Sequence, residues 1–153
     1  YSLTFQRYMD AYGLTNEDFG HYTVVARKHA ATNPAAWFYE RPITLEDHQN
    51  SRWIVEPILR LLDCCQESDG GVALVITTPE HARDLAQPPV MIRGVIDSQL
   101  IHGHVMFNYY HDDLTRYDEC YRAAERLWNL SGVGADEIDV ATIYENFSPI
   151  VFM

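Results

Sequence analysis

Tyr144 is the residue whose position in the sequence most favours a chemical role. It ends an apolar, β-branched run over 138–144 that predicts a strand, and the residues from Glu145 onward predict a helix. In layered α/β proteins, functional groups gather at the carboxyl ends of strands. A phenol, whose ordinary pKa is about 10, transfers protons once polar neighbours lower that pKa. A core tyrosine with a satisfied hydroxyl is the simpler interpretation as long as nothing else points to this residue.

Adjacent thiols at Cys64 and Cys65 form the second chemical candidate. A thiolate nucleophile needs a neighbouring base or a helix N-terminus to lower its pKa. Acidic residues surround the pair instead, at Asp63, Glu67 and Asp69, and negative charge raises a thiol pKa. We therefore interpret both cysteines as packing residues. The total of three cysteines, with no spaced disulfide framework, favours a reducing cytoplasm.

A histidine cluster offers ligands for a metal. His102-x-His104 followed by His111-Asp112-Asp113 contains imidazole and carboxylate groups, which bind zinc or iron. Two histidines two residues apart share a face in an extended segment. No second spaced cluster supports them, so we interpret these histidines as solvated and predict no metal site.

The run Arg27-Lys28-His29 is basic in an otherwise acidic chain. Consecutive helical residues face different ways, which favours a solvent-facing surface over an anion site. The chain has 22 acidic and 11 basic residues and a net charge of −11. Such a surface repels phosphate backbones and anionic lipids, and the apolar runs are too short to insert into a membrane. We expect neither nucleic-acid binding nor membrane insertion.

Helices are predicted on both sides of these candidates. Apolar spacing predicts one helix over 2–12, a second that ends at Ala31, and a third over 117–130. Capping boxes begin the second helix at Thr15 and a short helical turn at Thr44. A further helix is predicted to begin at a threonine–proline pair in the middle of the chain.

Strands are predicted between the helices. A continuous apolar run over 72–77 is typical of a strand that is buried on both faces, and 90–96 predicts the next strand. Residues 104–110 are expected to be extended. Together with 138–144 these runs predict a layered α/β fold. Residues 52–62, interrupted by a proline, predict an edge strand or an irregular piece.

The 153 residues and 47% hydrophobic composition alone suit one globular domain. The ends do not, because Tyr1 stands inside a predicted helix and residues 148–153 are apolar without a helix stop. We therefore expect a portion of a longer protein. Turn chemistry at Gln87-Pro88-Pro89 marks the predicted boundary between two domains.

Five short motifs follow one another in the first half of the chain: Arg27-Lys28-His29-Ala30, Pro42-Ile43-Thr44-Leu45-Glu46-Asp47, Ser51-Arg52, Leu61-Leu62-Asp63-Cys64-Cys65 and Ser68-Asp69-Gly70. In this order and spacing they resemble the thiolase superfamily, in the branch of the lipid-transfer-protein thiolases. The run from Ile43 to Leu62 is most similar to the steroid side-chain-cleaving aldolases of actinobacteria. The resemblance implies a thiolase-like layered α-β-α-β-α fold of two similar halves. Residues 1–87 would end the N-terminal half, with its loop region, and 88–153 would be the truncated start of the C-terminal half.

The resemblance also implies roles for two residues. Tyr144-Glu145-Asn146-Phe147 is similar to an Asn-Glu-Ala-Phe motif, and its tyrosine stands where thiolases have Asn or His. This departure argues against Claisen chemistry. In the aldolase branch a tyrosine here is one of two catalytic tyrosines, and the other would lie beyond Met153. Cys65 falls where thiolases have a serine near the pantetheine of coenzyme A, which implies a coenzyme A contact.

The function that the resemblance implies is a CoA-dependent retro-aldol cleavage of a steroid side-chain β-hydroxyacyl-CoA, as in cholesterol catabolism. The products would be a ring ketone and propionyl-CoA. Coenzyme A would enter as part of the substrate, with no permanently bound cofactor. A cytoplasmic homodimer with a small OB-fold partner protein is implied, and the chain alone is expected to be inactive. Two alternatives stay open, an acyl-CoA acyltransferase of the lipid-transfer type and a noncatalytic thiolase-like lipid carrier.

Overall fold

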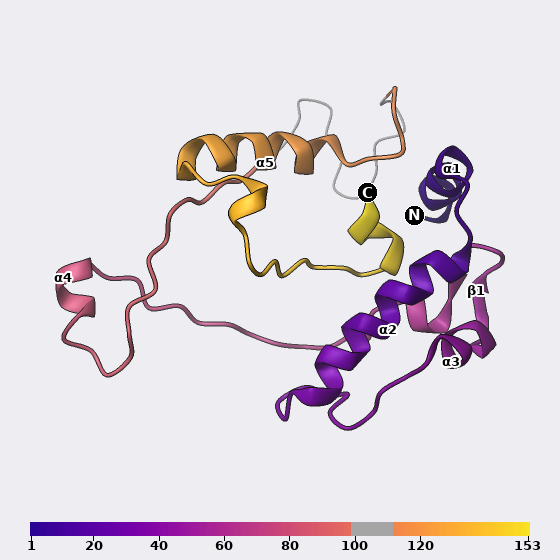
Figure 1. Cartoon of the computed structure of the whole chain (residues 1–153), viewed down its shortest axis with the longest axis horizontal. Coiled ribbons are helices and arrows are strands. Elements are labelled where there is room, and N and C mark those ends of the chain that lie inside the picture. The colour runs from indigo at the N-terminus through magenta and orange to yellow at the C-terminus, as the bar shows by residue number, and fades with distance from the viewer. Residues whose placement is uncertain (99–111) are drawn as a thin grey trace. The chain divides into compact units, whose positions relative to one another are not determined.

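The computed structural model describes residues 1–98 and 112–153 (Figure 1). The chain divides into two compact units. No helix among the described residues has the length and apolar character needed to cross a membrane. Unit 1 comprises Tyr1–Gln66, His102–Tyr117 and Thr142–Met153, and unit 2 comprises Glu67–Ile101 and Asp118–Ala141.

Two helices begin unit 1, as predicted. Helix α1 spans Ser2–Tyr12 and ends at Gly13, whose φ of 66° lies in the left-handed region that closes a helix. Helix α2 spans Asn16–Thr32, so the helix that was predicted to end at Ala31 is confirmed to within one residue. Helix α2 is the central element of unit 1. It packs against α3 (Leu45–Asn50), against the short helix η1 (Leu61–Asp63) and against the C-terminal helix η3 (Ser148–Phe152).

The two predicted capping boxes are both present. At the start of α2, the Thr15 N–H donates to Asp18 Oδ2 at 2.7 Å. At the start of α3, Leu45–Asn50, the Thr44 N–H donates to Asp47 Oδ2 at 2.8 Å, and the Asp47 N–H donates to Thr44 Oγ1 at 3.1 Å. These contacts satisfy N–H groups that have no partner inside the helix, so each helix begins where its local sequence directs.

A small hairpin follows α3. Strand β1, Trp53–Val55, pairs antiparallel with β2, Leu59–Arg60, and the 3-10 helix η1, Leu61–Asp63, comes directly after. Trp53 and Arg60 lie opposite each other, and the guanidinium carbon stands 3.6 Å from the centroid of the indole ring. This cross-strand cation–π contact stabilises the hairpin. The segment that was predicted to be one edge strand or irregular is therefore two short paired strands.

The apolar core of unit 1 combines residues from both ends of the sequence. The 3-10 helix η3 spans Ser148–Phe152 and takes the place of the helix predicted from Glu145. The centroids of the Phe152 and Phe19 rings lie 5.4 Å apart, and the Tyr8 hydroxyl donates to the Phe152 carbonyl at 3.0 Å. The buried apolar residues are Phe5, Met9, Phe19, Ile58, Leu59 and Met153.

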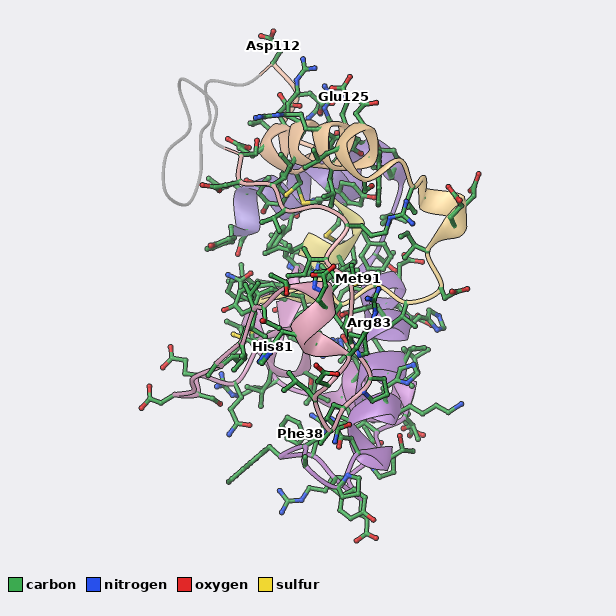
Figure 2. The ribbon with its side chains drawn as sticks, turned by 90° about the vertical axis from the view of Figure 1, so that its left-hand side faces the viewer. Phe38, His81, Arg83, Met91, Asp112 and Glu125 are labelled. Atoms are coloured by element: carbon green, nitrogen blue, oxygen red, sulfur yellow. The ribbon has the colours of Figure 1, made fainter. Side chains whose placement is uncertain are left out.

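Unit 2 has helices but no buried residue in its described part. The short helix α4, Pro79–Ala82, begins after a threonine cap as predicted. Helix α5, Asp118–Ser131, confirms the amphipathic helix predicted over 117–130, and it is followed by the 3-10 helix η2, Ala135–Glu137. Figure 2 shows Glu125 on α5, with Met91 on an extended stretch of the same unit.

The strand predictions outside the hairpin are wrong for the described residues. The runs over 72–77, 90–96 and 138–144 have no regular secondary structure, and Val72 is 91% exposed. A strand requires a neighbour that accepts and donates its backbone hydrogen bonds. Within the part of the chain that the structure describes, the hairpin forms the only sheet, so these runs have no such neighbour. The extended stretch predicted over 104–110 lies outside the described residues.

Candidate functional site

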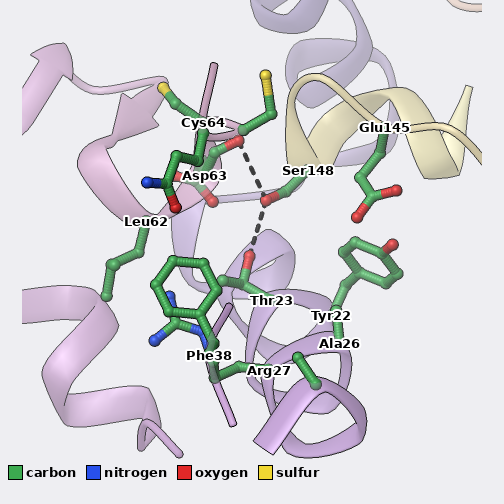
Figure 3. A pocket seen from close by; sticks show the side chains of 13 residues that line it. Tyr22, Thr23, Ala26, Arg27, Phe38, Leu62, Asp63, Cys64, Glu145 and Ser148 are labelled. Carbon is green, nitrogen blue, oxygen red and sulfur yellow. Dashed lines mark hydrogen bonds between the residues drawn. The ribbon is translucent and has the colours of Figure 1, made fainter. Parts of the chain in front are cut away.

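A pocket of about 270 Å³ lies in unit 1 (Figure 3). Helix α2 lines it with Tyr22 and Arg27, residues 62–66 line another part of its wall, and Glu145 and Ser148 come from the C-terminal segment. Three stretches that are far apart in the sequence therefore contribute to one cavity.

Buried hydroxyl groups join these stretches. Thr23 Oγ1 and Ser148 Oγ lie 2.7 Å apart, and Ser148 Oγ also donates to the Asp63 carbonyl at 3.5 Å. Nearby, the Cys65 N–H donates to the Asn146 carbonyl at 2.9 Å. The C-terminal segment is thus hydrogen-bonded both to α2 and to the cysteine segment, which fixes the wall of the pocket.

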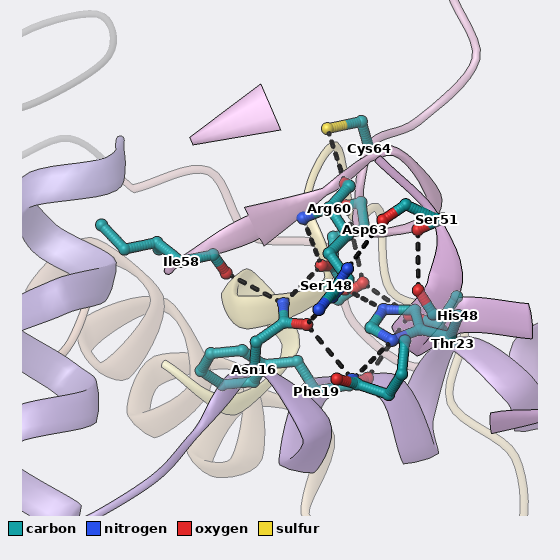
Figure 4. A network of polar contacts seen from close by, with 11 residues as sticks. Asn16, Phe19, Thr23, His48, Ser51, Ile58, Arg60, Asp63, Cys64 and Ser148 are labelled. Atoms are coloured by element: carbon teal, nitrogen blue, oxygen red, sulfur yellow. Dashed lines mark hydrogen bonds and ion pairs between the residues drawn. The ribbon is translucent and has the colours of Figure 1, made fainter. Parts of the chain in front are cut away.

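A buried, hydrogen-bonded pair of His48 and Asp63 stabilises the cysteine segment (Figure 4). His48 Nε2 lies 2.8 Å from Asp63 Oδ1, and both side chains are fully buried. Asp63 Oδ2 accepts from Asn16 Nδ2 at 2.7 Å and from the Arg60 N–H at 2.8 Å. Burial raises the pKa of the Asp63 carboxyl, but the hydrogen bonds from His48, Arg60 and Asn16 outweigh burial and hold that pKa below its usual value. The carboxylate is therefore charged and fully hydrogen-bonded, directly before Cys64.

Tyr22 and Glu145 form a pair in the wall of the pocket. Figure 3 shows the Tyr22 hydroxyl and the Glu145 carboxylate pointing toward each other. Burial, the negative charge of Glu145 and hydrogen bonding to it raise the pKa of Tyr22 to about 12. The Tyr22 phenol is therefore protonated at neutral pH and acts as a hydrogen-bond donor, not as a base.

Arg27 brings a positive charge to the same pocket. Its guanidinium carbon lies 3.6 Å from the centroid of the Phe38 ring, and its Nη1 donates to the Arg41 carbonyl at 3.3 Å. Burial and then the charge of Arg41 lower the pKa of Arg27. Lys28 and His29 are exposed as predicted, but the prediction is wrong for Arg27, which is half-buried.

The chain is similar in sequence to known proteins of one family. No protein-family model matches it. A steroid side-chain-cleaving aldolase of Thermomonospora curvata is 55% identical over 95% of the chain, which spans 37% of that protein. A 17-hydroxy-3-oxo-4-pregnene-20-carboxyl-CoA lyase of Mycobacterium tuberculosis is 47% identical over 97% of the chain, which spans 38% of it.

A thiolase is also among the relatives. The benzoylsuccinyl-CoA thiolase subunit BbsB of Thauera aromatica is 33% identical over 97% of the chain, which spans 37% of it. The solved structure of the Ltp2-ChsH2(DUF35) aldolase matches 98% of the chain with a TM-score of 0.93 and 53% identity, and the chain covers 39% of that structure's chain. The chain belongs to the thiolase superfamily. It has a thiolase-like α/β fold and spans less than two fifths of the length of these relatives.

Of the two predicted site residues of this thiolase-superfamily chain, one lines the pocket and the other does not. Cys65 lines the pocket and is exposed to solvent. Tyr144 is 85% exposed and does not line the pocket, but the next residue, Glu145, does. The predicted catalytic residue therefore directly adjoins the pocket wall, in an irregular segment and not at the end of a strand.

The remaining chemical candidates contribute less. Burial, followed by the charges of Asp63 and Cys65, raises the pKa of the Cys64 thiol, which opposes a nucleophilic thiolate there. The three histidines of the predicted cluster lie outside the described residues. Among the residues that are described, no group of three or more His, Cys, Asp or Glu side chains is arranged to hold a metal ion.

Neither the place of Tyr22 in the pocket wall nor the pairing of His48 with Asp63 could be predicted from the sequence. Tyr22 has the helical spacing of a core residue, and nothing local links it to Glu145. His48 lies in a short capped helix and Asp63 before two cysteines, and each has the pattern of a surface residue. A buried hydrogen bond between residues of separate elements leaves no local sequence signal, so only the fold could reveal it.

Proposed function

We propose that this chain is part of an enzyme that cleaves the side chain of a steroid acyl-CoA by a CoA-dependent retro-aldol reaction. The proposal rests on sequence identity. The chain is 55% identical to an aldolase and 47% identical to a CoA lyase, but only 33% identical to a thiolase subunit. The name of the lyase describes a hydroxyl at carbon 17 and a CoA carboxyl at carbon 20 of one steroid. Such a compound is a β-hydroxyacyl thioester, the substrate type that a retro-aldol reaction requires.

The proposed reaction needs one base and one acid. The base removes the proton of the 17-hydroxyl, the ring ketone forms, and the bond between carbons 17 and 20 breaks. Its electron pair enters the thioester as an enolate, and a proton added to carbon 20 completes propionyl-CoA. The atoms and electrons balance with these two products, and coenzyme A remains attached to the product throughout.

We assign the proton transfer to Tyr144. Its phenol stands at the position where thiolases have Asn or His, and it directly precedes a residue of the pocket wall. Cys65, in the same pocket, is assigned to contact the pantetheine arm of the substrate. The pocket of about 270 Å³ is proposed to take part of that arm.

The proposal extends to the larger assembly. Residues 1–87 would end the first half of a thiolase-like α-β-α-β-α fold, and residues 88–153 would begin the second. A second catalytic tyrosine would come from the polypeptide that follows Met153. The core would be a cytoplasmic homodimer, with a small OB-fold partner protein that completes the enzyme. The name of the similar solved structure, which pairs Ltp2 with ChsH2(DUF35), supports a protein partner.

The test uses a polypeptide of the relatives' full length that contains this sequence, together with its OB-fold partner. A 17-hydroxy steroid 20-carboxyl-CoA is supplied, and propionyl-CoA is quantified by mass spectrometry. We expect product from the complete enzyme and none from the 153-residue chain alone. We expect the Tyr144→Phe variant to lose at least ~100-fold in turnover, the usual effect of removing a general acid or base.

The matched control is Tyr12→Phe, which removes the hydroxyl of an exposed tyrosine on α1, outside the pocket. Its turnover should equal that of the unmodified enzyme. A folded Tyr144→Phe enzyme with normal turnover would overturn the role of this tyrosine. A complete enzyme that releases no propionyl-CoA would overturn the function itself and favour the acyltransferase or the carrier.

A further inference from the structure

Tyr144 makes no contact that would orient it. The residue is 85% exposed, and its side chain has no hydrogen bond or ion pair to any residue that the structure describes. A phenol that transfers a proton must lie within hydrogen-bond reach of the reacting atom. Its direction must therefore come from the backbone on which it stands.

The residues after Tyr144 are fixed, one after another. The Asn146 carbonyl accepts from the Cys65 N–H at 2.9 Å, and the Ser148 hydroxyl lies 2.7 Å from that of Thr23. Glu145 is the first held residue after Tyr144: it shares the pocket wall with Tyr22 on α2, and its carboxylate and the Tyr22 hydroxyl point toward each other (Figure 3). The backbone that follows Tyr144 is therefore held in place from Glu145 onward.

Loss of the Tyr22 hydroxyl would release Glu145. A half-buried carboxylate needs a donor or solvent, and the guanidinium of Arg27 lines the same pocket as the competing partner. Rotation of the Glu145 side chain toward Arg27 or toward water would remove the contact that holds the residue next to Tyr144, so the backbone at Tyr144 would lose one restraint. A misplacement of about 1 Å can cost about 100-fold in rate when it affects a reacting group.

We propose that Tyr22 is a positioning residue: its hydroxyl holds the Glu145 side chain and thereby sets the direction of the Tyr144 phenol. The inference rests on the proposed catalytic role of Tyr144. Tyr22 itself touches no reacting atom and does not transfer a proton, because its phenol is the donor in the contact with Glu145.

The competing explanation is that Tyr22 is simply a packing residue. Its ring packs edge-on against the Phe152 ring, with 6.2 Å between the centroids. Tyr22→Phe keeps the ring and this contact and removes only the hydroxyl. A packing role therefore predicts no effect of this variant on turnover, whereas a positioning role predicts a clear one.

The test measures kcat and KM of the complete enzyme with the steroid thioester. We expect Tyr22→Phe to lower kcat by about 10-fold with an unchanged KM, because the hydroxyl positions the catalytic group and does not bind substrate. Tyr12→Phe is the matched control and should leave both parameters unchanged. Glu145→Gln replaces a charged acceptor with a weaker neutral one, so its loss of kcat should be smaller than that of Tyr22→Phe.

The double variant decides the mechanism. If Tyr22 acts through Tyr144, adding Tyr22→Phe to Tyr144→Phe should cause no further loss, whereas independent roles would multiply the two losses. A normal kcat for Tyr22→Phe, or multiplied losses in the double variant, would overturn the positioning role and leave the proposed function intact. Normal turnover of Tyr144→Phe would instead overturn the catalytic role on which the inference depends.

Discussion

Units 1 and 2 use their apolar residues in different ways. Unit 1 buries Phe5 and Phe19 completely and adds a fully buried His48–Asp63 pair. In unit 2 no described residue is buried, and Val75 is 91% exposed. The apolar patterns explain this difference. Helices and a hairpin satisfy their own backbone, so unit 1 can pack its side chains, whereas strand-like runs need neighbouring strands before they can pack at all.

The largest expected effect tests the polar centre of unit 1. Asp63→Ala leaves His48, the Asn16 amide and the Arg60 N–H without their acceptor. Breaking a buried pair from one side costs about 3–5 kcal/mol, so we expect a loss of that size in the free energy of unfolding. Urea unfolding of the chain, followed by circular dichroism, measures it.

The matched control is the same change in unit 2. Asp69 is exposed, so Asp69→Ala should alter the free energy of unfolding by less than about 0.5 kcal/mol. Equal effects of the two variants would remove the contrast between the units.

A smaller effect is expected from an added methyl group. A Cβ on Gly20 would lie 2.7 Å from His48 Nδ1 and 2.9 Å from Leu45 Cδ1. Overpacking costs about 1–3 kcal/mol, and better helix propensity offsets about 1 kcal/mol. Because His48 is fixed in the network and cannot move away, we expect Gly20→Ala to lose about 1–2 kcal/mol in chemical denaturation. Gly71→Ala, with no atom within 4 Å of the new Cβ, should be neutral. A stabilised Gly20→Ala variant would contradict the tight contact with His48.

The smallest effect is expected where unit 2 is most exposed. Val75→Ser removes an apolar side chain that is already in solvent, so the free energy of unfolding of the chain should change by less than about 0.5 kcal/mol. The midpoint of thermal unfolding should also stay the same. A loss above about 2 kcal/mol would show that Val75 is buried after all, and the contrast between the units would fail.

The features that could be predicted from the sequence are those with local causes. The capping box of Thr44 and Asp47 begins a helix by contacts between near neighbours, and the structure has it where expected. Helix α1 likewise ends at residue 12, as its apolar spacing predicts. The strands at 72–77 and 90–96 depend on partners, which periodicity cannot supply. The same limit applies to the hairpin, whose Trp53–Arg60 contact depends on a turn that the apolar pattern does not reveal.

The site follows the same division. The roles of Tyr144 and Cys65 were predicted from short motifs that resemble those of the thiolase superfamily. Cys65 does line the pocket, and the role of Tyr144 stays a prediction. Tyr22 and Arg27 could not be assigned to the pocket, because it forms only where α2 meets segments from much later in the sequence.

The core of unit 1 also has a consequence for synthesis on the ribosome. Its first aromatic residues, Phe5 and Phe19, leave the ribosome long before Phe152 and Met153, against which the core closes. At roughly 5–20 residues per second, on the order of ten seconds separate the two events. During that interval the nascent helices α1 and α2 expose aromatic side chains that have no partner. The growing chain is therefore most exposed to aggregation and to chaperone binding early in translation, and a ribosome that stalls before residue 147 would release a polypeptide whose core cannot close.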